Sequence, residues 1–170
     1  MTRRVFAAAV LLTCMPVLAV AEDLPSKGVL THTVAERMIA ACFAAQADAG
    51  HARVSVFVVD DGGQLIAAAR QDGACKACAD IAQNKAITAA LYATPTRVFA
   101  DLSFGVARDG VEAGLPGAAF VPGLVAFAGG LPVSTTAGGV VGAIGVSGAS
   151  EDEDETCAQA GIDAVADILD

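Results

Sequence analysis

The 170-residue sequence contains no tryptophan and one tyrosine, and it is poor in positive charge. Most of its apolar residues are alanine and valine, so we expect a core built from small side chains. Ten lysines and arginines stand against 19 acidic residues, for a net charge of −9 at pH 7. Because nucleic-acid binding depends on cations that displace counterions from phosphates, this charge balance argues against a nucleic-acid partner. It disfavours anionic lipid for the same reason.

The sequence also lacks any apolar run of transmembrane length, and its first residues predict export instead. A basic start (Met1–Arg4) precedes an apolar run (Val5–Leu12) that is too short to span a bilayer. Small residues then lead to Ala21, which is the pattern of a secretory signal peptide. We predict a signal peptide over residues 1–21 and one mature domain over residues 22–170, located in the periplasm or secreted. A lipidated Cys14 is the alternative, although Thr13 fits poorly before such a cysteine.

Four cysteines remain after this segment, and an even number in an exported chain favours disulfides. Cys75 and Cys78 lie where a strand leads into a helix, and a local disulfide is the plain interpretation. Ala79 stands where c-type haem attachment needs histidine, and no second Cys or His pair suggests zinc. Cys78 begins a predicted helix, where the dipole lowers a thiol pKa, so a reactive pair stays open. Cys42 and Cys157 form a second disulfide if the first and last helices pack together.

Hydrophobic periodicity predicts an α+β domain. The sheet should be antiparallel, because its strands follow one another through glycine turns, and the helices should cover one face. A loop rich in glycine and proline occupies residues 103–123. The predicted order is helix-β-β-helix-β-β-β-helix, with five strands. The first helix begins with a capping box at Thr33 and Glu36 and ends at Gly50, the second covers residues 78–92, and the last is capped by Ser150 and Glu153 and runs to Leu169. The predicted strands are Val54–Val59, Leu65–Ala69, Leu124–Phe127, one near Val133, and Val140–Val146.

Five ordered blocks of sequence resemble the GlcG/HbpS family, also called the haem-degrading or PduO C-terminal-like family, over about residues 33–169. The resemblance implies a profilin-like antiparallel sheet flanked by helices, symmetric homo-oligomers, and haem or iron binding in some exported members. The Cys75-Lys76-Ala77-Cys78 segment departs from the family's small or polar residues at this place. The blocks are Val58–Leu65, Arg70–Ala74, Lys85–Ala90, Gly129–Val133 and Val141–Gly148, followed by Asp154.

The candidate ligand-binding residues are Arg70, Lys85, Thr88 and Tyr92. Lys85 and Thr88 are three residues apart, so they share a helix face, and Arg70 ends the strand before that helix. Two cations and a hydroxyl can hold a carboxylate such as a haem propionate. The alternative is an ion pair from Lys85 or Arg70 to an aspartate (Asp72, Asp80 or Asp154) that ties helix to sheet.

The candidate iron ligands are the two histidines, because neutral imidazole is the commonest axial ligand. His32 precedes the first helix and is the first choice. His51 follows the Gly50 stop and reads as an exposed turn residue. Tyr92 and Met38 are weaker candidates, and Met38 reads as core.

Two further motifs carry no site. The glycines of Gly142-x-x-Gly145-x-x-Gly148 invite a nucleotide-loop interpretation, but the five carboxylates of Glu151–Glu155 would repel a phosphate. These glycines fit close packing of the strand against a helix or a neighbouring subunit. The acidic run reads as a solvated helix cap, and we predict no metal site.

The sequence thus predicts an exported, homo-oligomeric protein that binds a small ligand, with haem preferred over a small carboxylate. A haem-degrading or cysteine-based redox enzyme is one alternative. An accessory subunit of an exported dehydrogenase system is another. Nucleic acid is not an expected partner, nor is a membrane after signal cleavage.

Overall fold

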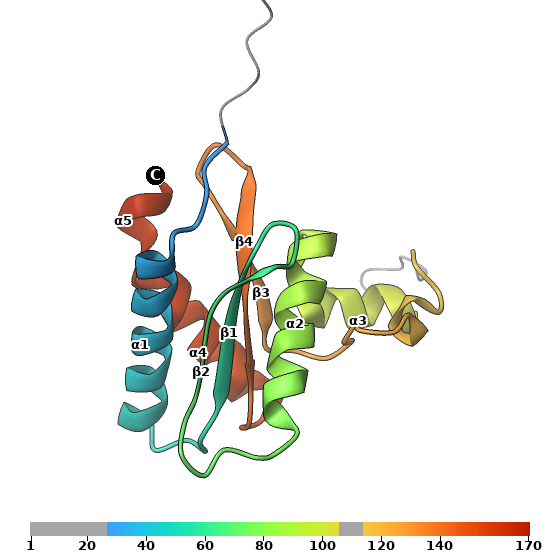
Figure 1. Cartoon of the computed structure of the whole chain (residues 1–170). Helices are drawn as coiled ribbons and strands as arrows, with labels where there is room; N and C mark the ends of the chain where they lie inside the picture. The colour runs from blue at the N-terminus through green and yellow to red at the C-terminus, as the bar shows by residue number, and fades with distance from the viewer. Residues whose placement is uncertain (1–26, 106–113) are drawn as a thin grey trace, which may run out of the picture.

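The computed structural model describes residues 27–105 and 114–170, and the predicted signal peptide lies outside these ranges. No helix within them is long and apolar enough to span a bilayer. The elements follow the order helix, hairpin, two helices, short 3-10 turn, hairpin, two helices (Figure 1). They are α1 (His32–Asp48), β1 (Ser55–Asp60), β2 (Leu65–Arg70), α2 (Cys78–Tyr92), α3 (Thr96–Phe104), η1 (Ala118–Phe120), β3 (Gly130–Ser134), β4 (Val140–Ser147), α4 (Glu151–Asp163) and α5 (Ala166–Leu169).

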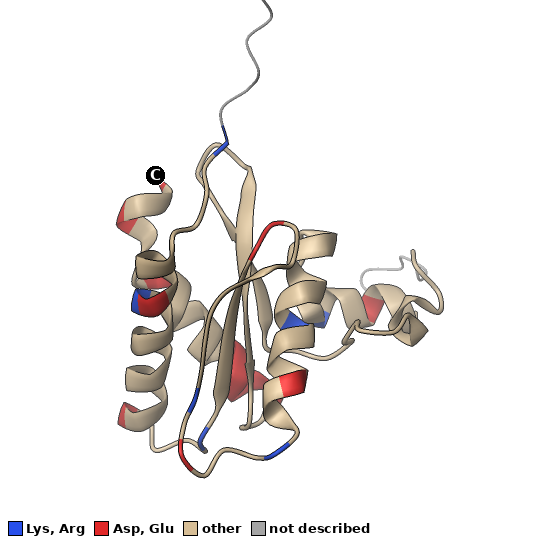
Figure 2. Cartoon of the chain, viewed as in Figure 1, with Lys and Arg blue, Asp and Glu red and all other residues tan. Residues whose placement is uncertain are grey.

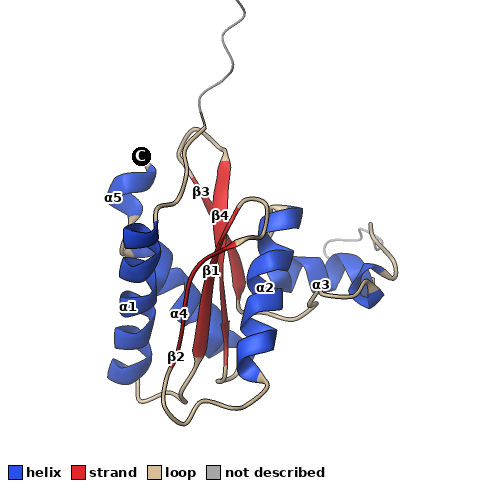
Figure 3. Ribbon diagram, viewed as in Figure 1, coloured by secondary structure: helices blue, strands red, loops and turns tan. Residues whose placement is uncertain are grey.

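The four strands form one antiparallel sheet in the order β2-β1-β4-β3 (Figure 3). Val56 and Val58 of β1 belong to one core cluster with residues of α1 and α4, whereas Phe57 and Val59 pack with alanines of α2. Since successive side chains of a strand point to opposite faces, α1 and α4 cover one face and α2 covers the other. The expectation of helices on one face only is therefore wrong. Both faces of the central strands are apolar because both are covered.

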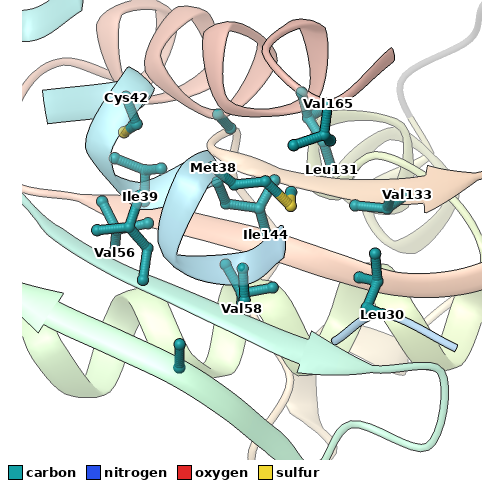
Figure 4. Close-up of a cluster of buried hydrophobic side chains, with 14 of the residues drawn as sticks. Leu30, Met38, Ile39, Cys42, Val56, Val58, Leu131, Val133, Ile144 and Val165 are labelled. Atoms are coloured by element: carbon teal, nitrogen blue, oxygen red, sulfur yellow. The ribbon is translucent and has the colours of Figure 1, made fainter. Parts of the chain in front are cut away.

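The larger core cluster lies between the sheet and the pair α1 and α4 (Figure 4). Met38 and Cys42 of α1 and Ile144 of β4 belong to it, and all three side chains are fully buried. The Cys42–Cys157 disulfide joins α1 to α4 inside this cluster, across a sequence separation of 115 residues. The predicted packing of the first and last helices is confirmed, and so is their disulfide.

The predicted fifth strand at Leu124–Phe127 is absent, since these residues lie in no strand of the sheet. Side chains take the place of a strand partner at one N–H of this segment and at the N–H of the residue after it. The Val125 N–H donates to the Thr88 hydroxyl at 2.9 Å, and the Ala128 N–H donates to the Glu151 carboxylate at 3.0 Å. The apolar run is therefore held against α2 and α4 without joining the ladder.

Three helix boundaries also differ from the prediction. The N-cap of α1 is Thr31, whose hydroxyl accepts from the Val34 N–H, so the capping box expected at Thr33 is wrong. Helix α3 occupies the start of the predicted 103–123 loop and the residues before it. The last helix is interrupted after Asp163, and α5 follows as a separate short helix. The capping box at Ser150 and Glu153 is confirmed in both of its hydrogen bonds.

Gly145 explains how α2 lies so close to β4. A Cβ atom at this position would lie 2.1 Å from the Ala82 carbonyl oxygen and 2.4 Å from the Ala86 nitrogen. These are backbone atoms that cannot move aside, so only glycine permits this contact between helix and strand. The predicted role of the glycine-rich strand in helix packing is confirmed here.

Candidate functional site

Lys85 of α2 is the largest fully buried side chain among the described residues. Its Nζ donates to the Asp154 carboxylate of α4 and to the Val146 carbonyl of β4, both at 2.8 Å. The Phe127 ring lies 4.8 Å from the same nitrogen, in cation–π geometry. Of the alternatives that the sequence left open, the structure thus shows the ion pair with Asp154.

The Lys85 side chain reaches Asp154 past the start of β3. Gly130 begins that strand, and the Gly129 carbonyl accepts the Val146 N–H at 2.8 Å. On the β3 side β4 has no strand neighbour beyond this point, although β1 still pairs with Val146 and Ser147 on the other side. The Lys85 ammonium takes the Val146 carbonyl that a longer β3 would have served. A Cβ at Gly129 would lie 2.6 Å from Nζ, so glycine leaves the path open. The ion pair therefore closes the end of the sheet.

Burial dominates the electrostatics of this pair. It lowers the pKa of the Lys85 ammonium, against the opposing attraction of Asp154. It raises the pKa of the Asp154 carboxyl, against the attraction of Lys85 and a hydrogen bond from the Ala149 N–H. Both charges are held by hydrogen bonds inside the protein. The arrangement ties α2, β4 and α4 together rather than presenting a cation to a ligand.

The other three predicted ligand-binding residues do not gather around Lys85. Thr88 is fully buried, and its hydroxyl donates to the Asn84 carbonyl and accepts from the Val125 N–H. Tyr92 ends α2, and its ring centroid lies 4.6 Å from that of Phe99. Arg70 is exposed at the end of β2 and donates to the Ala74 carbonyl.

A different region of the structure is hollowed. Helix α1 and the edge strand β2 enclose an open groove of about 310 Å³, which we call the α1–β2 groove. Its helix residues recur at the spacing of one helical face, and its strand residues are alanines whose short side chains leave the space open. Its lining is His32, Glu36, Ile39, Ala40, Phe43, Ala67, Ala68 and Ala69.

His32 lies at the first turn of α1, beside the Ile66 carbonyl of β2. Its Nδ1 is 3.2 Å from that oxygen, and its Nε2 is 3.3 Å from the Glu36 carboxylate. A carbonyl partner at Nδ1 fixes the ring orientation and directs Nε2 outward, which is how protein histidines are commonly held for metal ligation. The predicted first-choice ligand is therefore on the one face of α1 that borders the α1–β2 groove.

His51 is placed differently. It lies after α1, with Nδ1 3.0 Å from the Gln46 side-chain oxygen and Nε2 3.6 Å from the Glu153 carboxylate. Over residues 27–105 and 114–170, no three His, Cys, Asp or Glu side chains cluster in a way that could hold a metal ion. The acidic start of α4 is instead partly neutralised by Arg97, which pairs with Asp152 and Glu155.

The second cysteine pair is bonded as well. Cys75–Cys78 closes the connection between β2 and α2, with Cys78 as the first residue of the helix. The predicted local disulfide is confirmed.

Sequence reasoning missed most of the α1–β2 groove. The helical spacing of His32, Glu36, Ile39 and Phe43 was a usable signal. The alanines of β2 that line the groove gave no such signal, because alanine at these positions is equally consistent with a filled core.

The chain belongs to the family described as "Haem degrading protein HbpS-like", whose model matches residues 30–163. It is 34% identical to "Protein GlcG" of Escherichia coli strain K12 over 122 residues, which cover 72% of this chain and 84% of that protein.

Solved structures agree with the family. A double-mutant form of HbpS from Streptomyces reticuli has a TM-score of 0.72 and 35% identity, over 90% of this chain and 98% of that one. A structure described as a PduOC:Heme complex has a TM-score of 0.69 and 26% identity, over 81% of this chain and 95% of that one.

Proposed function

We propose that this protein binds haem, with one edge of the macrocycle in the α1–β2 groove and Nε2 of His32 as the iron ligand. The observation that supports it is an imidazole beside an apolar groove, in a member of a family whose described relatives include a haem complex. The groove volume of about 310 Å³ lies at the lower end of the range for ligand pockets. It is also open, so part of a flat ligand would project from it.

The lining residues fit this group. Ile39, Phe43 and the alanines of β2 supply apolar surface for the ring, and no cation lines the groove. The ligand's carboxylates would therefore face solvent. Bound haem would supply redox and small-ligand chemistry at its iron.

Glu36 has a defined effect in this arrangement. Its carboxylate lies 3.3 Å from Nε2 and so competes with iron for the nitrogen that would ligate it. Replacement by glutamine removes the competing charge. We expect Glu36→Gln to tighten haem binding by a few fold.

The test is titration of haem into the pure protein, followed by Soret absorbance. Wild type should give a shifted band, and His32→Ala should lose the shift and weaken binding by at least about tenfold. His51→Ala is the matched control, because that histidine lies outside the groove lining. If His32→Ala shows the same Soret shift as wild type, the ligand assignment is refuted. If wild type itself shows no Soret shift, haem binding is refuted.

A second variant tests the groove without touching the ligand. Ala40 lies on the exposed side of α1 and lines the groove, so Ala40→Trp fills the space with little strain on the core. Ala47→Trp, on an exposed position of the same helix outside the lining, is its control. Loss of haem binding in the first and retention in the second support the placement; equal affinities of the two contradict it.

We also propose that the protein self-associates through an apolar arm made of α3 and residues 114–123. The arm projects from the domain in Figure 1, and residues 114–129 contain no charged side chain. In a chain of net charge −9, two copies repel least where neither carries charge. Figure 2 shows residues 114–123 without charge, and α3 carries one cation and one anion, Arg97 and Asp101. Large apolar side chains are exposed on it or at the nearby end of α2: Leu91, Tyr92, Phe104, Leu115, Phe120 and Val121.

Sedimentation velocity tests this surface. Phe120 is 82% exposed, so Phe120→Asp should leave folding intact while it shifts the protein toward monomer. Ile168→Asp, at an exposed apolar position on α5, should leave the assembly unchanged. An equal response of both variants would contradict the arm as the interface.

We also propose that the protein is exported and acts in the periplasm or outside the cell. Two disulfides among the described residues support it, because such bonds persist in oxidising compartments. The mass of the protein purified from a periplasmic fraction tests it, with cleavage after Ala21 as the expected result.

A further inference from the structure

The Cys75–Cys78 disulfide occupies an exposed tip between two anchored residues. Cys75, Lys76 and Ala77 are exposed, whereas Ala74 and Cys78 on either side are buried. The Ala74 carbonyl accepts from the Arg70 guanidinium, and the Cys78 N–H donates to the Cys75 carbonyl at 3.3 Å. These two hydrogen bonds hold the tip in place in addition to the sulfur–sulfur bond.

The surroundings of the buried sulfur favour a negative charge. Cys78 is the first residue of α2, and the N-cap Ala77 provides no side-chain hydrogen bond to the free N–H groups. These groups and the helix dipole stabilise an anion at this position. The ammonium of Lys76 adds positive charge to the tip, while Asp72 and Asp80 lie on its two flanks and oppose it.

The second disulfide provides an internal contrast. Cys42 and Cys157 are both fully buried, and their bond joins two helices 115 residues apart. An external thiol cannot reach that bond without opening the core. In contrast, Cys75 is an exposed residue, and its bond joins cysteines only three positions apart.

From these observations we infer that Cys75–Cys78 is a redox-active disulfide that exchanges with external thiols, with Cys75 as the attacked sulfur. A thiolate of the external molecule forms a bond to Sγ of Cys75, the Sγ–Sγ bond breaks, and the electron pair stays on Cys78 as a thiolate. The second thiol of a dithiol partner then attacks the mixed disulfide and releases Cys75. The partner leaves as a disulfide, and the protein gains two electrons and takes up two protons.

The test uses the oxidised full chain in native buffer, with glutathione as the monothiol and dithiothreitol as the dithiol. Samples are quenched with acid at intervals, free thiols are alkylated, and each cysteine peptide is quantified by mass spectrometry. Cys75 and Cys78 should become alkylated at least about tenfold faster than Cys42 and Cys157. Circular dichroism and the urea midpoint of the selectively reduced protein should show a retained fold.

Single variants identify the attacked sulfur. With oxidised glutathione, Cys78→Ser should accumulate a glutathione adduct on Cys75 and release one reduced glutathione, because the buried resolving thiol is gone. Cys75→Ser should form no adduct on Cys78, which is only 4% exposed. Lys76→Ala should slow the reaction with the anionic glutathione by a few fold and leave the rate with dithiothreitol nearly unchanged.

Three results would overturn the inference. The first is reduction of both disulfides at one common rate, which would mean that opening requires global unfolding. The second is loss of the fold on selective reduction, since the bond would then be a structural staple. The third is preferential adduct formation on Cys78.

Discussion

Replacement of Lys85 by methionine tests whether the buried ion pair is a structural element. Methionine keeps most of the side-chain volume but removes the ammonium. Asp154, which is 2% exposed, then lacks its partner, and the Val146 carbonyl loses its donor. The unpaired buried charge costs about 3–5 kcal/mol, and an unsatisfied buried acceptor adds about 1–3 kcal/mol.

These costs overlap, because Asp154 can take up a proton instead of remaining charged. We therefore expect a loss of about 4 kcal/mol in the free energy of unfolding, from a total that is typically about 5–15 kcal/mol. Urea denaturation of the disulfide-intact protein measures it. Arg37→Met is the matched control: its pair with Asp167 is largely exposed, so the loss should stay under about 1 kcal/mol.

A double-mutant cycle separates the pair from its surroundings. Lys85→Met combined with Asp154→Leu removes both charges and should cost less than the sum of the single variants. It should still be destabilising, because the Val146 carbonyl and the Ala149 N–H both lose side-chain partners.

The pH dependence of the stability loss in Lys85→Met provides a further check. Burial already raises the Asp154 pKa above its ordinary value, and removal of Lys85 raises it further. A raised carboxyl pKa makes the folded state less stable as pH rises through it, and this loss disappears below the unfolded value of 3.8. The deficit of Lys85→Met should thus shrink toward pH 4. A single-variant loss below about 1 kcal/mol, or a deficit independent of pH, would refute the reasoning.

Three other predictions concern stability, and urea unfolding measures each of them. Replacement of Cys42 and Cys157 by serine should cost about 4–5 kcal/mol, because the bond closes a very long loop. Gly145→Ala should cost at least about 3 kcal/mol through its clash with the α2 backbone. Gly139→Ala should cost under about 1 kcal/mol, because the new Cβ would make only an ordinary contact with the Thr135 hydroxyl at 3.8 Å. Ser150→Ala should lose about 1 kcal/mol with the capping box. Equal losses at the two glycines, or no loss at the cap or the disulfide, would contradict the corresponding argument.

Much of the fold could be predicted because its signals are local. The alternating β-branched run before Asp60 and the glycine turn after it specify a hairpin, and the Ser150 cap specifies the start of α4. The run Leu124–Phe127 misled the prediction because its composition is that of a strand. The Val125 N–H and the N–H of the following Ala128 donate instead to Thr88 and Glu151, which are far away in the sequence.

The sequence by itself determined the α+β class, the hairpins, the cysteine inventory and the family, since these rest on short-range patterns and ordered blocks. Only the tertiary structure decided that helices cover both faces of the sheet and that Lys85 forms an ion pair with Asp154. It also decided that His32 borders a groove lined by the alanines of β2. The physical reason is that a side chain's chemistry depends on what surrounds it. A lysine in a helix reads the same in sequence whether it faces solvent or an aspartate 69 positions away in the core.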